Sequence, residues 1–292
     1  MSLTIQQYAL AHALDVSNGG HRMEPWPAAL PDHLSPTSIS KHQRCPEAFR
    51  QRYVLGRKER AGEGLAIGSA VHEALEYSFR EKISTRDDLP TGALLDYYDD
   101  VAWPASLEEK EEVGLIIWDT TEELAHARGK LMLGEYHNQV SPRVQPLAVE
   151  QWIDVDFGAP VPVRGRYDVE TEHEMIDIKT GKRKQSKPKE DWRVQGGIYH
   201  EHAGKPVAFH VVSATEKTST VSIQTPLDTP RLLVAPSVAQ RQRMRENVRM
   251  IAATIQFYFT VLGPEEPWPT LGEYHDWACD WCGFRSDCVA WQ

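Results

Sequence analysis

The hydrophobic residues of this chain change their spacing along its length. Up to about residue 137 they recur mostly every three or four positions, the spacing of helices that bury one face. From 146 to 180 they alternate with polar residues instead, which predicts strands. The elements predicted after residue 146 are strands at 149–157, 161–169 and 175–178, a helix over 191–203, strands over 207–214 and 218–225, and a two-part helix over 231–262. This order is typical of an α/β domain around a mixed central sheet.

Capping signals bound the helices of the first half. A serine and a proline at 35–36 supply an N-cap and a first helical residue. Cys45-Pro46 separates this helix from a second one, because a residue before proline is pushed out of the helical region. A third helix is predicted over 68–83. Ser106 opens the pattern Ser-Leu-Glu-Glu, a capping box that predicts the start of a long helix extending to His137.

Length and composition favour one large folded domain. The chain has 292 residues, 41% of them hydrophobic, enough to bury a full core. It has no apolar run of the roughly 18 residues that cross a bilayer and no signal-peptide pattern, so we expect a cytoplasmic protein that does not bind membranes. The expected organisation is an appendage over 1–33 and a domain over 34–292 that contains a helical insertion (about 84–145) and a C-terminal tail (about 264–292).

Charge is distributed unevenly. The formal net charge of −10 argues against a non-specific nucleic-acid coat. Residues 179–193 are nevertheless strongly basic, and a second basic stretch lies over 44–60. Local basic segments of this kind can contact a phosphate backbone, although an ordinary solvated loop explains them equally well. The candidate DNA contacts in the first stretch are Lys182, Arg183 and Lys184.

The most informative chemistry lies in the predicted hairpin. Asp168 ends the segment Gly-Arg-Tyr-Asp, and the next strand carries Asp177-Ile-Lys179. Alternate strand residues face the same side, so Asp177 and Lys179 share a face, and Asp168 can meet them across the pairing. Two carboxylates beside an ammonium group can hold a divalent cation and activate water against a phosphodiester. Alone, an Asp-x-Lys strand is usually a surface charge pair.

Three further groups of residues make a catalytic role for that hairpin more plausible. His72 lies on a predicted helix and can add an imidazole, although a helical histidine is usually a core residue. Gln195 and Tyr199 lie one helical turn apart shortly after the Asp-x-Lys strand, a pair that is more often packing than function. Glu150 precedes the hairpin. Its alternation with the apolar residues predicts that it faces away from them, which favours a surface glutamate and leaves a catalytic role second.

The four cysteines are Cys45, Cys279, Cys282 and Cys288. Disulfides are not needed in a chain of this length without a secretory signal, so metal ligation is favoured. The spacing allows either tetrahedral Zn²⁺ or an iron–sulfur cluster.

Taken in order, these motifs resemble the RecB/AddB-type exonucleases of the PD-(D/E)XK superfamily, including their CRISPR-associated relatives. The resemblance runs from about Leu34 to the C-terminus. The matching motifs are Leu34-Ser-Pro-Thr-Ser-Ile-Ser with Cys45-Pro-Glu-Ala-Phe49, Gly68 with His72, Leu75 and Glu76, Gly165 to Asp168, Asp177-Ile-Lys179-Thr-Gly181, and Gln195 with Tyr199. The ordered set is far more specific than any of its members.

The resemblance implies a restriction-endonuclease-like fold, with helices flanking the mixed sheet, and a role for each motif. His72, Asp168, Asp177 and the carbonyl of Ile178 are expected to bind Mg²⁺ or Mn²⁺, hard cations that prefer oxygen ligands. Lys179 is expected to position the attacking water and stabilise charge on the phosphate. The implied function of Gln195 and Tyr199 is to orient Lys179 or contact the DNA backbone.

For the cysteines the resemblance implies a 4Fe–4S cluster, with Zn²⁺ as the alternative. Cys45 and the three C-terminal cysteines are then expected to join the N- and C-terminal segments of the domain. Such a link closes a very long loop and restricts the unfolded chain, so a structural role is expected.

These expectations combine into a metal-dependent DNA exonuclease that acts on single strands or DNA ends in recombination, repair, or phage or CRISPR DNA processing. The chain has no Gly-x4-Gly-Lys-Ser/Thr helicase loop, so a separate helicase, recombinase or CRISPR adaptation protein is the expected partner. The alternative is a non-catalytic DNA-binding or assembly module that keeps the fold and the cluster. The presence of Asp168, Asp177 and Lys179 favours the enzyme.

Overall fold

The computed structural model describes residues 25–59, 61–111, 116–214, 220–270, 279–280 and 282–290. The chain divides into two compact units, each built from segments distant in sequence. One, which we call the sheet unit, comprises Arg60–Ile153 and Arg166–Ala235. The other, the terminal unit, comprises Met1–Glu59, Asp154–Gly165 and Pro236–Gln292.

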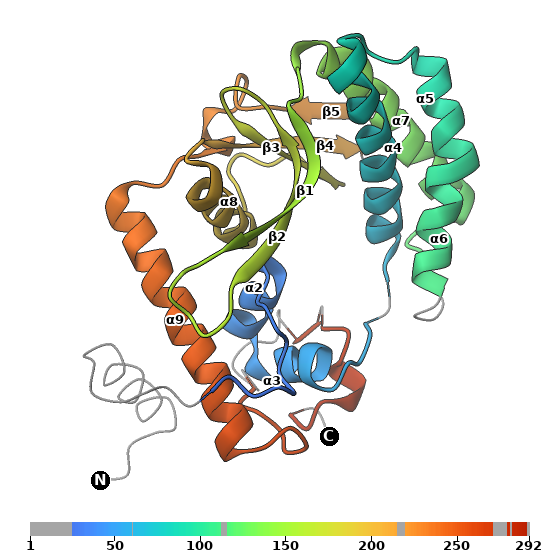
Figure 1. The fold of residues 1–292 in the computed structure, drawn as a ribbon. Coiled ribbons are helices and arrows are strands. Elements are labelled where there is room, and N and C mark those ends of the chain that lie inside the picture. Colours follow the sequence, from blue (N-terminus) through green and yellow to red (C-terminus); the bar gives the residue numbers. More distant parts are fainter. Residues whose placement is uncertain are drawn as a thin grey trace. The chain divides into compact units, whose positions relative to one another are not determined.

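The central sheet is mixed, as the alternating pattern predicted. Its strands follow the order β1-β2-β3-β4-β5, and β6 pairs with β4 (Figure 1). Strands β3 and β4 are parallel, with Asp177 opposite Phe209 and Lys179 opposite Val211. The pairs β2–β3, β4–β5 and β4–β6 are antiparallel. The strands are β1 (Ala148–Val155), β2 (Val163–Glu170), β3 (Met175–Gly181), β4 (Val207–Ala214), β5 (Val221–Gln224) and β6 (Leu233–Val234).

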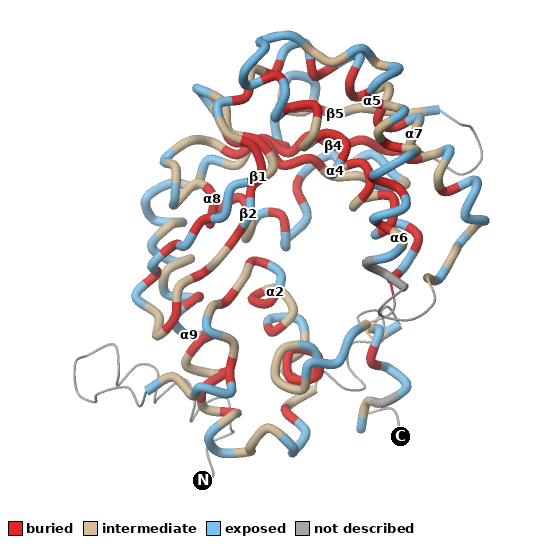
Figure 2. Tube along the Cα trace, turned by 45° about the vertical axis from the view of Figure 1, so that its right-hand side comes forward, coloured by how far each residue is buried: buried red, intermediate tan, exposed pale blue. Residues whose placement is uncertain are grey.

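Helices flank both faces of the sheet, which confirms the α/β fold class. Every residue of β4 is buried (Figure 2). Ala208 joins the core formed with α4 (Glu63–Thr85) and α7 (Glu122–Gln139). Its neighbour Phe209 points to the opposite face. There it stacks on Trp192 of α8 (Glu190–Ala203), with ring centroids 5.7 Å apart. Strand β3, which pairs with β4, therefore lies between two helical layers (Figure 1).

The helical insertion differs from the single long helix predicted over 106–137. Helix α5 (Thr91–Tyr97), the π-helix η2 (Tyr98–Ala102) and α6 (Trp103–Glu111) precede α7. Ser106 lies inside α6, where its hydroxyl donates to the Trp103 carbonyl, so it does not cap a helix. The next helix starts afresh, because the side chain of Thr121 caps α7 by accepting from the backbone N–H of Leu124. The prediction of one continuous helix was wrong.

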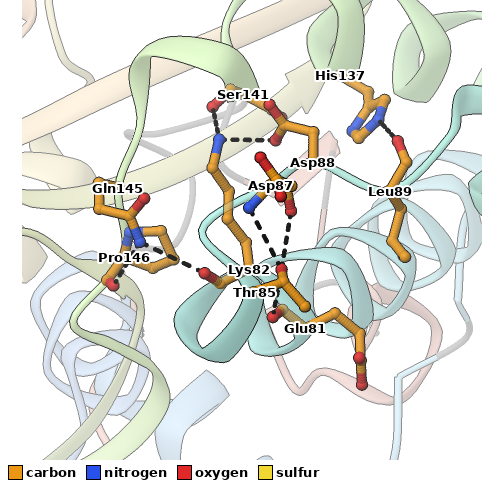
Figure 3. A network of polar contacts seen from close by, with 10 residues as sticks. All are labelled: Glu81, Lys82, Thr85, Asp87, Asp88, Leu89, His137, Ser141, Gln145 and Pro146. Atoms are coloured by element: carbon orange, nitrogen blue, oxygen red, sulfur yellow. Dashed lines mark hydrogen bonds and ion pairs between the residues drawn. The ribbon is translucent and has the colours of Figure 1, made fainter.

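A buried lysine fixes the C-terminal part of α4 (Figure 3). Only 3% of Lys82 is exposed, and its ammonium donates to a carboxylate oxygen of Asp88 and to the Ser141 carbonyl, both at 2.7 Å. Asp88 follows α4 directly, and Ser141 starts the 3-10 helix η3 (Ser141–Arg143) after α7. The network therefore ties the end of α4 to the segment that leads into β1.

Three short elements and one long helix form the core of the terminal unit. They are α2 (Pro36–Arg44), α3 (Pro46–Phe49), the π-helix η1 (Arg50–Val54) and α9 (Val238–Val261). The predicted cap is confirmed, since the Ser35 side chain accepts from the Ser38 N–H. Helix α9 starts later than predicted. The 3-10 helix η4 (Pro230–Leu232) and β6 come first, and Ser237 then caps the helix.

A carboxylate joins the two ends of the terminal unit. Glu47 accepts hydrogen bonds from Arg50 and Gln51 and, 221 residues away in sequence, from the backbone N–H of Trp268 at 2.7 Å. Arg50 also donates to the Pro264 carbonyl at 2.7 Å. We call this group the Glu47 clamp. It links α3 to the C-terminal tail through protein groups alone.

Among the described residues, no helix combines the length and the apolar character needed to cross a membrane.

Candidate active site

Three side chains from different elements of the sheet unit converge on one point. His72 comes from α4, Glu150 from β1 and Asp168 from β2. One ligand atom of each lies within 4.8 Å of the others. The same three residues line a pocket whose apolar wall includes Leu75 and Phe79. A helix and two neighbouring strands thus supply an imidazole and two carboxylates to a common site.

Close packing of α4 on β3 brings His72 to this position. Gly68, one turn before His72, approaches the Thr180 hydroxyl so closely that an added Cβ would lie 3.3 Å from it. A larger residue here would require the Thr180 side chain to shift by a few tenths of an ångström. Val71 and Leu75 flank the histidine and are buried in the core. His72 Nδ1 then lies 3.5 Å from Asp168 Oδ1.

The Glu150 side chain points into the interior, whereas the sequence favoured a position on the surface. It is 8% exposed and adjoins buried Val149, so two consecutive residues of β1 point inward. The reason is local: Glu150 has a φ of 50°, the left-handed conformation. That conformation breaks the alternation of the strand, turning the carboxylate into the pocket and exposing the next two residues. Regular alternation, the basis of the prediction, does not apply here.

Asp168 and Asp177 are held in different ways. Asp168 Oδ2 accepts from the Ile178 N–H at 2.5 Å across the β2–β3 pairing. Asp177 is 1% exposed, and its Oδ1 lies 2.6 Å from the Lys179 ammonium. Within the described residues, neither oxygen of Asp177 has a partner in hydrogen-bond geometry. Asp177 is not one of the three groups that converge within 4.8 Å, and a role for the Ile178 carbonyl stays a prediction.

A chain of hydrogen bonds holds Lys179. Its ammonium donates to Gln195 Oε1 at 2.8 Å, and the Gln195 amide donates to the Tyr199 hydroxyl at 2.9 Å. That hydroxyl in turn donates to the backbone carbonyl of Arg166 at 2.6 Å. Gln195 and Tyr199 lie one turn apart on α8, so both reach β3 from the same side. The Arg166 carbonyl thus fixes the Tyr199 hydroxyl, which fixes the Gln195 amide, which in turn fixes the Lys179 ammonium.

The environment of the site shifts the pKa values of its acidic groups and of His72. Burial raises the pKa of Glu150 to about 8, and the nearby charge of Asp168 adds to the effect. Burial also raises the pKa of Asp177 to about 6. For His72, burial opposes the charged form, but the charge and hydrogen bond of Asp168 outweigh it and raise the pKa to about 9. His72 likewise outweighs burial at Asp168 and lowers its pKa.

Burial opposes the charge of Lys179 as well, but Asp177 and Asp168 raise its pKa, so the ammonium stays protonated.

These donors suit a divalent metal ion. Carboxylate oxygens and imidazole nitrogens are ligands for Mg²⁺ and Mn²⁺. Asp177 Oδ1 is paired with the Lys179 ammonium, and Oδ2 has no hydrogen-bond partner among the described residues, so it could serve as a ligand. Burial, with the neighbouring charge of Asp168 second, raises the pKa of Glu150, and a bound cation would favour its charged form. The residues present therefore fit the metal that the sequence suggests.

The basic loop after β3 divides into two parts. Lys182 is engaged within the sheet unit, because its ammonium lies 2.8 Å from Asp119 and 3.9 Å from Glu63. Of the three DNA contacts predicted in this loop, Arg183 and Lys184 are exposed and form no ion pair within the described part of the chain.

All four cysteines are free, half-buried and in the terminal unit. Cys45 separates α2 from α3, as predicted. Burial raises the pKa of Cys282 and of Cys288, and the charge of Cys45 adds to both effects, so the three sulfurs lie near one another. The backbone N–H of Cys282 donates to the Cys279 carbonyl at 3.1 Å in a tight turn.

A model of the PD-(D/E)XK nuclease superfamily matches residues 33–289. The chain belongs to this superfamily. Among solved structures, it is similar to a provisionally named exonuclease from Eubacterium rectale, with 12% identity, a TM-score of 0.42, and coverage of 86% of this chain and 84% of that one. It is also similar to SSO0001, with 13% identity, a TM-score of 0.35, and coverage of 99% and 97%. No curated protein matches it.

In this PD-(D/E)XK protein the sequence motifs fall on neighbouring strands, but motif reading missed Arg166. Its Nε lies 2.6 Å from Glu150 Oε2, and its carbonyl receives the Tyr199 hydroxyl. The only signal in the sequence is its place two residues before Asp168. A role for this arginine can be inferred only once the left-handed conformation of Glu150 is known, because that conformation brings the two side chains together.

Proposed function

We propose that this chain is a Mg²⁺- or Mn²⁺-dependent DNA exonuclease that hydrolyses phosphodiester bonds in single-stranded DNA or at DNA ends. The observation that carries the proposal is the convergence of His72 from α4, Glu150 from β1 and Asp168 from β2 within 4.8 Å, in the same sheet as the Asp177–Lys179 pair of β3. A site that only binds DNA has no need to bury three acidic groups together. Gathering carboxylates is costly, and in the metal-free protein a proton on Glu150, His72 beside Asp168 and Lys179 beside Asp177 offset that cost. A divalent cation would replace the protons.

His72, Glu150 and Asp168 would hold the metal, with Asp177 and the Ile178 carbonyl completing the set that the family resemblance predicts. The chemistry that such a cation supplies is a lower pKa for bound water and neutralisation of charge on the phosphoryl oxygens. Hydrolysis adds a water oxygen to phosphorus, breaks one ester P–O bond and delivers a proton to the leaving oxygen. The protein's own groups orient these partners.

Lys179 is the group assigned to the phosphate. Its ammonium is a compact positive charge, held by Gln195 and Asp177, and it can donate to a phosphoryl oxygen as negative charge develops there. Gln195 and Tyr199 act as positioning residues, because they fix where Lys179 points. Lys179 stays charged through neutral pH, since its pKa is raised.

Within the superfamily, the motif order favours RecB/AddB-type exonucleases and their CRISPR-associated relatives. We therefore place the protein in the cytoplasm, beside a helicase, recombinase or CRISPR adaptation protein that opens duplexes for it. The exposed basic pair Arg183 and Lys184 supports contact with a phosphate backbone.

We also propose that Cys45, Cys279, Cys282 and Cys288 hold a 4Fe–4S cluster. Thiolate ligands suit such a cluster, and three of the sulfurs influence one another electrostatically. The alternative occupant is Zn²⁺, which takes the same ligands. Anaerobic purification followed by iron, sulfide and zinc analysis separates the two. Zinc without iron would replace the cluster proposal, and neither metal would remove it.

The function is tested with 5′- and 3′-labelled oligonucleotides, single-stranded and blunt duplex, in Mn²⁺, Mg²⁺ or EDTA. We expect cleavage products that shorten stepwise from an end, only with metal, and fastest on single strands. Asp168→Asn and Lys179→Ala should abolish them. The matched control is Asp154→Asn, a half-exposed aspartate of the terminal unit that pairs only with Arg164 at the surface. A wild-type protein that binds DNA without cleaving it would favour the non-catalytic module.

A further inference from the structure

One aromatic side chain stands out on the surface beside the candidate active site. Trp152, on β1 two residues after Glu150, is 67% exposed. In the described part of the chain, every other tryptophan, tyrosine and phenylalanine is buried or half-buried. Exposing an indole to water is unfavourable, because it leaves a large apolar surface hydrated. A strand of this sheet thus presents its one exposed ring next to the acidic pocket.

The same backbone feature that buries Glu150 exposes Trp152. The left-handed conformation of Glu150 breaks the alternation, so Gln151 and Trp152 both face solvent before Ile153 returns to the core. A non-glycine residue in this conformation costs about 1–3 kcal/mol, and such strain is concentrated at functional sites. The inward carboxylate and the outward indole are therefore consequences of one local turn.

Arg166 connects the indole to the pocket. Its guanidinium carbon lies 5.5 Å from the centre of the Trp152 ring, a cation–π contact, while its Nε lies 2.6 Å from Glu150 Oε2. The side chain is 48% exposed. Its terminal nitrogens have no other partner among the described residues. Glu150 contacts the Nε edge of the guanidinium, and the Trp152 ring covers one of its faces. The two terminal nitrogens remain as donors, and their planar arrangement suits a phosphate group.

We propose that Trp152 and Arg166 form a nucleotide-binding subsite, in which an unpaired base stacks on the indole and the guanidinium contacts the adjoining phosphate. Stacking requires an exposed base face, and a base inside a duplex has both faces covered by its neighbours. The subsite therefore selects a single-stranded or frayed end. It rests on the proposed function, because it defines the DNA strand that the pocket would cut.

The base-stacking half is tested with Trp152→Ala and Trp152→Phe. Single-stranded oligonucleotides carry either normal nucleotides or one abasic residue at each of the last three positions. We expect Trp152→Ala to raise KM for the normal strand about tenfold with kcat nearly unchanged, and Trp152→Phe to restore most of the loss, since stacking contributes about 1–3 kcal/mol per base, or roughly 5- to 150-fold. One abasic position should weaken the wild type but not Trp152→Ala.

Leu147→Ala is the matched control, because Leu147 is also apolar, is 53% exposed and directly precedes β1. It should leave KM and the abasic penalty unchanged. If Trp152→Ala behaves like Leu147→Ala on every strand, the stacking proposal is overturned.

The phosphate half has a separate readout. Binding of a labelled single strand is measured in Ca²⁺ by fluorescence anisotropy at several salt concentrations. Each phosphate contact contributes a slope of about −0.7 to log K against log salt for single strands. Arg166→Gln should reduce the slope by about that amount, whereas Trp152→Ala should weaken binding without changing it. An unchanged slope in Arg166→Gln refutes the phosphate contact.

The binding assay also separates this proposal from the proposed function, because it needs no cleavage. Wild-type cleavage with no effect of Trp152→Ala leaves the nuclease and removes the subsite. Binding that depends on Trp152 without any cleavage leaves the subsite and removes the nuclease. Absence of both binding and cleavage overturns both.

Discussion

Lys179 of β3 donates a 2.8 Å hydrogen bond to Gln195 of α8, the helix on the opposite side of the strand from α4. Two helical layers thus act on one strand: α4 delivers the imidazole and α8 delivers the group that holds the ammonium. Tyr199 completes the second arm by bonding Gln195 and the Arg166 carbonyl. Metal ligation and lysine positioning are therefore separable by mutation.

Removing the positioning arm should slow catalysis without weakening metal binding. Tyr199→Phe deletes the hydroxyl that receives the Gln195 amide, so we expect kcat to fall about tenfold while the Mn²⁺ dissociation constant stays within twofold. Lys179→Ala should lower kcat by about 100-fold or more, the loss typical of a donor to developing negative charge. Steady-state kinetics and calorimetric metal titration check both. Equal kcat in Tyr199→Phe and wild type would show that the arm does not position Lys179.

Metal binding should release protons at neutral pH. His72 and Glu150 have pKa values of about 9 and about 8, so both carry a proton at pH 7 in the metal-free protein. Ligation requires the unprotonated forms. We expect Mn²⁺ titrations at pH 7, in two buffers of different ionisation enthalpy, to report more than one proton released. Glu150→Gln should lower that number by about one. A release that does not change in this variant would exclude Glu150 as a ligand.

The metal-free protein should become less stable as pH rises. The pKa of Glu150 goes from 4.5 unfolded to about 8 folded, and that of His72 from 6.5 to about 9. Across these windows the folded state binds more protons, so the free energy of unfolding falls with pH, by a few kcal/mol for shifts of this order. The lowered pKa of Asp168 acts only in acid, where its contribution is lost. Urea unfolding in EDTA at pH 5 and pH 8.5 measures the difference, which Glu150→Gln should reduce.

The sequence predicted the strands and the hairpin chemistry because those rest on local rules. Alternation alone places Asp177 and Lys179 on one face of β3, and helical spacing places Gln195 and Tyr199 together. Glu150 was predicted to face the surface because nothing in Val-Glu-Gln-Trp marks a left-handed residue, and only the packing around the pocket favours it. The positions of Arg166 and Trp152 beside the site were not predicted for the same reason.

The helix boundaries in the insertion could not be predicted from local sequence rules either, for a different reason. Ser106 and Thr121 both precede glutamates, and both resemble helix starts. The one at Ser106 lies within a helix that begins at Trp103, while the one at Thr121 is a real cap. The segment between them is held by Glu63 of α4, which accepts from the Thr120 N–H at 2.9 Å. This contact joins residues 57 positions apart, so the local sequence around Thr121 does not contain it.

The Lys82 network predicts a stability change far from the chemistry. Asp88→Asn removes the charge that faces a 97%-buried side chain, since Lys82 is 3% exposed. We expect a loss of about 3 kcal/mol in the free energy of unfolding, typical of a buried charge left without its partner. Glu81→Ala, an exposed neighbour on the same helix, should change it by less than about 0.5 kcal/mol. Urea unfolding of both variants at pH 7 provides the comparison, and equal midpoints would contradict the role of the ion pair.

Two kinds of link could join the N-terminal helices to the C-terminal tail, and mutation of the Glu47 clamp distinguishes them. A cysteine-bound cluster would link Cys45 to the tail, but Glu47 already reaches the Trp268 N–H and Arg50 the Pro264 carbonyl. Glu47→Ala leaves the Arg50 guanidinium buried without a carboxylate, so we expect a loss of about 3–5 kcal/mol whether or not metal is bound.

Cys45→Ser should differ from this. In metal-free protein we expect it to change the free energy of unfolding by less than about 1 kcal/mol, because a half-buried thiol contributes little packing. In metal-loaded protein the loss should be larger, since ligation free energy is folding free energy. Urea titrations of both variants, each with and without metal, measure the four values. A Glu47→Ala variant as stable as wild type after metal removal would mean that the clamp does not hold the tail.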